Sequence, residues 1–148
     1  MTAEFGQLQF DRHLTAAPER VFAALISPQD RMAWGPPDSG SIVVIDPQDP
    51  PAPGGREQSR CGPRDNPYVD VATDWVVMDA PGRLIYAETL SAEGDVLATS
   101  FATFELAADG AGTQLRVTIH IANFAGEGML GEVESGWTHA LDNLMQHV

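Results

Sequence analysis

Two polar residues of the segment 83–90, Tyr86 and Glu88, are the side chains best placed to do chemistry. The segment alternates as a strand does, and both residues share parity with its apolar positions, which places them on its inner face. A poorly solvated carboxylate there would have a raised pKa and could act as an acid, a base or an anchor for a ligand. Alternatively, Glu88 lies near the strand end and reaches water, or pairs with Arg12, or orients the polar head of a ligand together with Arg12.

Aromatic side chains could surround that position. If the alternation of the strands holds, four of them face the space between the strands and the C-terminal segment. As the walls of a pocket they would offer stacking surface and polar groups, whereas as ordinary core they would fill the space. The four are Trp34, Tyr86, Phe104 and Trp137.

The pattern around Trp75 does not decide which side of its strand is inside. Trp75 and Val77 share one parity, Val76 and Met78 share the other, and both pairs are apolar. An exposed pair would be a candidate surface for a homodimer.

Metal-binding and nucleotide-binding patterns are absent from the sequence. The His residues form no HxxxH pair, and the single Cys61 belongs to no CxxC pair. Neither GxSxG nor a phosphate-binding glycine motif occurs. The GAGT at 110–113 is read as a hairpin turn, because a phosphate-binding loop leads into a helix and this segment precedes a strand. We therefore expect no metal, no cofactor and a structural or incidental thiol, and no motif assigns a catalytic residue.

The C-terminal segment 129–148 is amphipathic and predicts the main helix of the domain. At about 100° per residue its apolar residues fall within one arc, and such a stripe must be buried. Gly131 and Gly136 each cost roughly 1 kcal/mol relative to Ala; Gly136, beside the stripe, would permit close packing or the approach of a ligand. The stripe consists of Met129, Leu130, Val133, Trp137, Ala140, Leu141, Leu144 and Val148.

Pro and Gly residues divide the rest of the chain into short elements. Pro18 begins a helix at a position where its missing N–H costs nothing, and Pro28 ends that helix. The short segment 28–34 then reaches Trp34, and the stretch Asp46–Gly55 is a loop by composition. Strands are predicted at 5–14, 41–45, 56–61, 69–78, 83–90, 96–106 and 113–122.

This order of elements predicts a single α+β domain over residues 1–148. One curved antiparallel sheet of about six or seven strands would wrap around the C-terminal helix, with two short N-terminal helices closing one end. A parallel sheet is not expected, because no helices alternate with the later strands.

The composition limits the classes of partner. The 148 residues include 8 basic and 21 acidic side chains, and the net charge of −13 disfavours nucleic acid and anionic membrane surfaces. We expect neither a membrane span nor a signal peptide, and the single Cys suits a reducing cytoplasm. The acidity favours solubility; its alternative is a docking face for a basic partner.

Several motifs occur in an order that resembles a known superfamily. They are APERVFAALISP followed by Trp34, PGGR at 53–56, APGRLIYAE at 80–88, ATFEL, GAGTQLRVTI and ESGWTHALDNL. The set resembles the START-like, helix-grip (SRPBCC) superfamily of polyketide cyclases and birch-pollen-allergen proteins. Within it, the chain is most similar to the family named for the activator of the heat-shock-protein-90 ATPase. The chain departs from that family after PGG, where REQSR replaces an aromatic-containing strand.

The resemblance implies the helix-grip fold and a hydrophobic cavity under the long helix. We therefore expect a domain that binds a small hydrophobic or aromatic molecule. One alternative is a cyclase or aromatase that uses Glu88 or Tyr86 as acid or base, and a second is a co-chaperone-like module that acts through its acidic surface. The candidate ligand-binding residues are Trp34, Tyr86, Glu88, Phe104, Val117, Ile119, Val133, Trp137 and Leu141.

Overall fold

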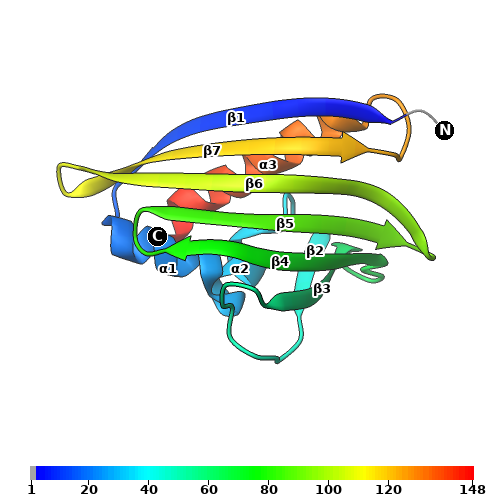
Figure 1. Cartoon of the computed structure of the whole chain (residues 1–148), viewed down its shortest axis with the longest axis horizontal. Helices are drawn as coiled ribbons and strands as arrows, with labels where there is room; N and C mark the ends of the chain where they lie inside the picture. Colours follow the sequence, from blue (N-terminus) through cyan, green and yellow to red (C-terminus); the bar gives the residue numbers. More distant parts are fainter. Residues whose placement is uncertain (1–2) are drawn as a thin grey trace.

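One antiparallel sheet, with a long helix packed across its inner face, makes up most of the structure (Figure 1). The computed structural model describes residues 3–148. Its elements are β1 (Glu4–Leu14), α1 (Pro18–Ile26), α2 (Pro28–Trp34), β2 (Ser41–Ile45), β3 (Arg56–Pro63), β4 (Val69–Asp79), β5 (Arg83–Ala92), β6 (Asp95–Asp109), β7 (Gly112–Asn123) and α3 (Met129–His147).

The seven strands lie in the order β1-β7-β6-β5-β4-β3-β2, and every neighbouring pair is antiparallel. The sheet curls, α3 crosses behind it, and α1 and α2 lie at one end (Figure 1). The predicted α+β helix-grip architecture is therefore confirmed, including its two short N-terminal helices. Within residues 3–148, no helix is long and apolar enough to cross a membrane.

The corner between α1 and α2 is built from one Ser-Pro pair. Ser27 is extended (φ −66°, ψ 124°), as expected for a residue that precedes proline. Its hydroxyl accepts a hydrogen bond from the backbone N–H of Asp30 (3.3 Å), so Ser27 ends α1 and caps α2. This turn carries Arg31 and Trp34 toward the inner face of the sheet.

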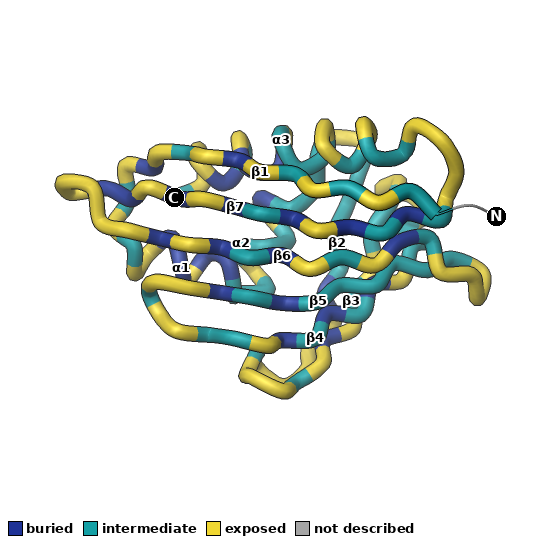
Figure 2. Tube along the Cα trace, turned by 45° about the horizontal axis from the view of Figure 1, so that its top comes forward, coloured by how far each residue is buried: buried dark blue, intermediate teal, exposed yellow. Residues whose placement is uncertain are grey.

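Burial alternates along the central strands, and buried segments interrupt exposed ones along β6 and β7 (Figure 2). The inward residues form one core with α1 and the second half of α3. Along α3, Ala140, Leu141 and Leu144 are buried, whereas the predicted stripe is less buried nearer Met129. The first half of the helix thus lies over space that the core does not fill.

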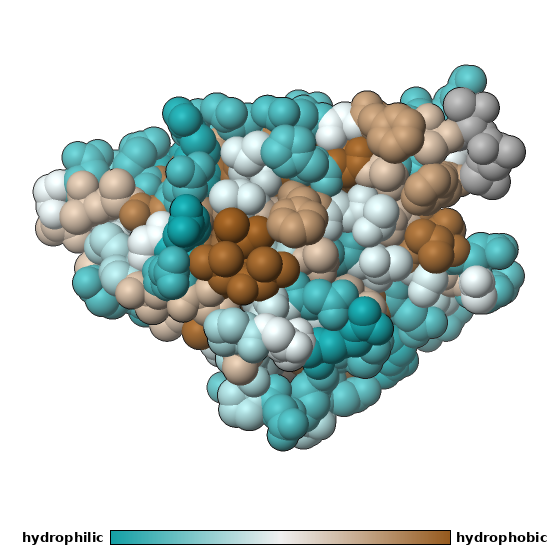
Figure 3. All heavy atoms as spheres, in the orientation of Figure 1, coloured by the Kyte–Doolittle hydropathy of each residue, from teal (hydrophilic) through white to brown (hydrophobic). Residues whose placement is uncertain are grey.

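A β-bulge explains why the pattern around Trp75 was ambiguous. The register of β4 against β5 shifts between Trp75 and Val77, so Trp75 pairs with inward-facing Tyr86 and Met78 packs against the core. Val76, the extra residue of the bulge, lies on the outer face of the sheet and is 46% exposed. Figure 3 shows apolar surface near the middle of the face seen in Figure 1. Homodimer formation through this face stays a prediction.

Candidate functional site

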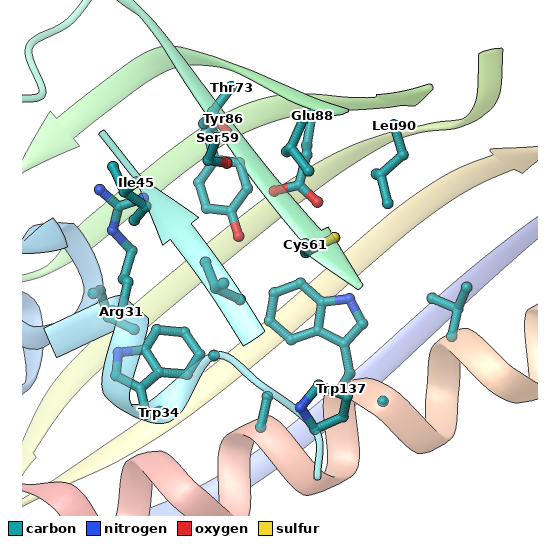
Figure 4. Close-up of a pocket in the computed structure, with 18 of the residues that line it drawn as sticks. Arg31, Trp34, Ile45, Ser59, Cys61, Thr73, Tyr86, Glu88, Leu90 and Trp137 are labelled. Carbon is teal, nitrogen blue, oxygen red and sulfur yellow. The ribbon is translucent and has the colours of Figure 1, made fainter. Parts of the chain in front are cut away.

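A cavity of about 290 Å³ lies between α3, α2 and the inner faces of β2 to β6. This volume is at the lower end of the ~300–1,000 Å³ typical of ligand pockets. Side chains from both layers point into it, as Figure 4 shows for Trp34, Tyr86, Glu88 and Trp137. The cavity therefore joins the chemically interesting residues of the sequence in one place.

The nine sequence-predicted site residues separate into two groups. The cavity is lined by Trp34, Tyr86, Glu88, Phe104, Val133 and Trp137. Val117, Ile119 and Leu141 do not line it; each is fully buried in the adjoining core. They face inward as predicted, but from β7 and from the second half of α3, where the layers are in contact. Ligand binding by the other six residues stays a prediction.

The polar end of the cavity holds a buried ion pair that the sequence did not reveal. Arg31 donates from Nη1 and Nη2 to the two carboxylate oxygens of Glu57, at 2.6 and 2.7 Å, and from Nη2 to the Ile26 carbonyl at 3.1 Å. Glu57 is only 3% exposed. A bidentate Arg–carboxylate pair is among the strongest hydrogen-bonded ion pairs in proteins, although Nε of Arg31 is buried without a partner within residues 3–148.

Strand β3 supplies this carboxylate because it is an interior strand, flanked by β2 and β4. Its residues alternate, with Glu57, Ser59 and Cys61 inward and Arg56 exposed outside. The place where the sequence departs from the family that it resembles is therefore a polar wall of the cavity. The alternation of REQSRC was the one available signal, and it became informative only once the position of the strand was known.

Glu88 lies on the inner face of β5, as its parity predicted. Burial raises the pKa of its carboxyl from 4.5 to about 7, while nearby Arg31 lowers it and Glu57 raises it. The side chain keeps some accessible surface because it opens onto the cavity, whose mostly apolar lining solvates a charge poorly. Glu88 can therefore change its charge close to neutral pH.

The proposed alternative partner of Glu88, Arg12, is not near it. Arg12 lies opposite Leu115 in the sheet register and donates to the Asp11 carbonyl (2.9 Å). Its guanidinium lies over the Phe10 ring, 5.6 Å from the centroid. Two strands separate β1 from β5, which is why a shared parity did not bring the two side chains together.

Two other titratable neighbours of Glu88, Cys61 and Tyr86, stay neutral. Burial, and then the charge of Glu88, raises the pKa of Cys61 to about 11 and that of Tyr86 well above its ordinary value. Both therefore remain protonated near neutral pH. Figure 4 shows the Tyr86 hydroxyl and the Glu88 carboxylate pointing into the same space.

The aromatic residues form a continuous wall from β4 to α3. Trp75 meets Tyr86 edge-on at 5.4 Å between centroids, Tyr86 stacks on Phe104 at 5.7 Å, and Phe104 contacts Trp137 at 6.0 Å. Trp34 is fixed separately, because its Nε1 donates to the Ala24 carbonyl (2.9 Å). Trp75, which the sequence could not orient, thus belongs to this wall.

We expect Glu88→Gln to stabilise the folded chain at pH 8 and to have little effect at pH 4. The folded chain holds the Glu88 proton up to about pH 7, whereas the unfolded chain releases it near 4.5. The stability that Glu88 contributes is therefore full below pH 4.5 and is lost as the pH rises through 7. The gain at pH 8 should be on the order of 2 kcal/mol.

Urea unfolding of both proteins at the two pH values measures this difference. Glu134→Gln is the matched control, because it removes the same charge from an exposed position of α3. An equal response of the two variants to pH would contradict a raised pKa at Glu88.

Within the described residues 3–148, no group of His, Cys, Asp or Glu side chains is arranged to hold a metal ion. The polar groups of the cavity come from Arg31, Tyr86, Glu88 and the smaller Ser59 and Thr73. This set can bind, orient and exchange a proton with an organic molecule.

Comparison with known proteins places the chain in a family. Residues 15–148 match the family described as Activator of Hsp90 ATPase homolog 1-like protein. No curated protein matches the chain. Several solved structures share its fold over nearly the whole length.

A putative uncharacterized protein from Rhizobium leguminosarum is 24% identical, with a TM-score of 0.81 over 99% of this chain and 95% of that one. Mll3558 from Rhizobium loti is 22% identical, with a TM-score of 0.82 and 100% of both chains covered. CV1439 from Chromobacterium violaceum is 21% identical, with a TM-score of 0.82 over 95% of this chain and 94% of that one. The family match covers the elements that build the cavity, and the chain belongs to the family of Activator of Hsp90 ATPase homolog 1-like proteins.

Proposed function

We propose that this protein binds a small apolar or aromatic molecule in the cavity under α3. The observation that carries the proposal is the aromatic-lined cavity of about 290 Å³ that adjoins one continuous cluster of buried core residues. Protein interiors are normally filled to the density of organic crystals, with few voids larger than a water molecule. Such a volume is therefore costly to maintain unless a ligand uses it.

The two glycines of α3 offer a direct test. A Cβ added at Gly131 or Gly136 would meet no atom within 4 Å, so neither glycine is required for close packing, and only Gly136 lines the cavity. We expect both Gly→Ala variants to be more stable, by up to about 1 kcal/mol, because Ala is the better helix former. Only Gly136→Ala should weaken ligand binding, because its methyl group projects into the cavity.

Titration with naphthylethanol, an uncharged aromatic probe, can be followed by calorimetry. The expected result is measurable binding, weaker in Gly136→Ala and unchanged in Gly131→Ala. A probe that does not bind, or that binds all three proteins equally, would contradict binding in this cavity.

A second function, acid–base catalysis of the cyclase kind, is favoured by one observation. Glu88 has a pKa of about 7 and lies beside Tyr86 in the cavity, and an acid–base catalyst works best when its pKa is close to the working pH. If the bound molecule is a substrate, Glu88→Gln should lower turnover by about 10²–10⁴-fold and leave binding intact. Unchanged turnover in this variant would exclude Glu88 as the base.

A further inference from the structure

We infer that the cavity selects ligands that join an apolar or aromatic body to a protonated amine, with Glu88 as the counter-ion. The inference rests on the proposed binding function and names the chemical class of ligand. The selection rests on charge: the cationic side chain at the cavity already has an ion-pair partner, whereas the carboxylate of Glu88 has none within residues 3–148.

The one cationic group of the cavity lining is already occupied. Both terminal nitrogens of Arg31 donate to Glu57, and one also donates to the Ile26 carbonyl. The remaining nitrogen, Nε, has no hydrogen-bond partner within residues 3–148, but it is buried and offers no accessible donor to a ligand. A carboxylate or phosphate on a ligand would have to displace Glu57, which is 3% exposed and would then be left as an unpaired buried charge. Anionic ligands are therefore disfavoured.

The anionic group is not occupied. Among the ion pairs of residues 3–148, none includes Glu88. Arg31 and Glu57 cancel each other, so ionised Glu88 leaves the cavity with a net negative charge. A ligand ammonium placed there would gain a charge-assisted hydrogen bond in a poorly solvated site.

The walls suit the same ligand. The ring of Tyr86 lies two residues before Glu88 on the same face of β5, and Trp137 faces it from α3 (Figure 4). Aromatic faces attract cations through the negative charge of the ring face. The rings also provide an apolar surface for the ligand body.

The groups that face Glu88 set the pH dependence. They are Arg31 from α2, Glu57 and Cys61 from β3, and Tyr86 from β5. Cys61 and Tyr86 stay neutral because burial raises the pKa of each. Glu88 alone changes charge near neutrality, so the affinity for an amine should rise as the pH increases through about 7. An alkyl amine stays protonated to about pH 10.

Three probes with the same bicyclic body separate the possibilities: naphthylethylamine, naphthylethanol and naphthylacetate. At about pH 8.5, where Glu88 is ionised, we expect the amine to bind about tenfold or more tightly than the alcohol, and the acetate to bind most weakly. At about pH 5.5, where Glu88 is protonated, the preference for the amine should largely disappear. Isothermal titration calorimetry measures all the affinities.

Two variants assign the preference to Glu88. Glu88→Gln should reduce the affinity for the amine to that for the alcohol, and Glu134→Gln, which removes the same charge from the surface, should preserve the preference. Equal binding of amine and alcohol, tightest binding of the acetate, or a preference that survives Glu88→Gln would overturn the inference and leave the proposed function intact if the alcohol binds. If none of the probes binds, the proposed function fails and the inference fails with it.

Discussion

Replacing Arg31 with Met is expected to destabilise the protein by about 3–5 kcal/mol, because it removes the one partner that a buried carboxylate has within residues 3–148. Glu57 is 3% exposed, and its ion-pair partner is Arg31. The substitution also leaves the Ile26 carbonyl without the bond from Nη2. Urea unfolding at neutral pH measures the loss.

Two comparisons make this test specific. Arg56→Met breaks a similar bidentate pair with Asp74, which joins β3 to β4 on the exposed outer face, where little change is expected. The double variant Arg31→Met, Glu57→Leu should recover most of the loss, because no buried charge remains. Equal effects of Arg31→Met and Arg56→Met would show that burial does not determine the strength of the pair.

Phe104→Ala is expected to lower the free energy of unfolding by about 3–5 kcal/mol, and Trp137→Ala should lower it by less even though it removes the larger side chain. Phe104 is 1% exposed and contacts both Tyr86 and Trp137. Trp137 is only partly buried and borders the cavity, so part of its contact surface has no partner in the empty protein. Urea unfolding with unchanged m-values would establish the order.

A bound ligand should change this comparison. Saturating naphthylethanol should stabilise the parent through binding to the folded state, and Trp137→Ala should lose part of that gain. If Trp137→Ala costs as much as Phe104→Ala in the empty protein, Trp137 is ordinary core and the cavity is smaller than its lining indicates.

Much of the fold could be predicted because local patterns determine it. Alternation and turn residues located the strands, the Pro28 stop located the end of α1, and the apolar stripe located α3. The bulge at Val76 could not be predicted, because both faces of that segment are apolar and an added residue leaves no mark in such a pattern.

The site was only partly predictable, because parity gives the face of a strand but not what lies above it. Glu88 and Tyr86 face the cavity as their parity indicated, whereas Ile119 has the same inward orientation and lies in solid core. The pairing of Arg31 with Glu57 joins α2 to β3 across 26 positions of sequence. A single sequence carries no local signal for such a contact.

The uneven packing of α3 has a consequence for the rate of ligand exchange. Its buried residues, Ala140, Leu141 and Leu144, all lie in the second half, so that half is anchored to the core while the first half borders the cavity. Segments with few buried contacts open at lower free energy than the core does. Amide hydrogens of residues 132–137 should therefore exchange with deuterium faster than those of 140–146, and a ligand should slow the first group most. Uniform protection along the helix would contradict this. The residence time of a ligand would then be set by how often the first half of α3 detaches from the sheet, rather than by unfolding of the domain.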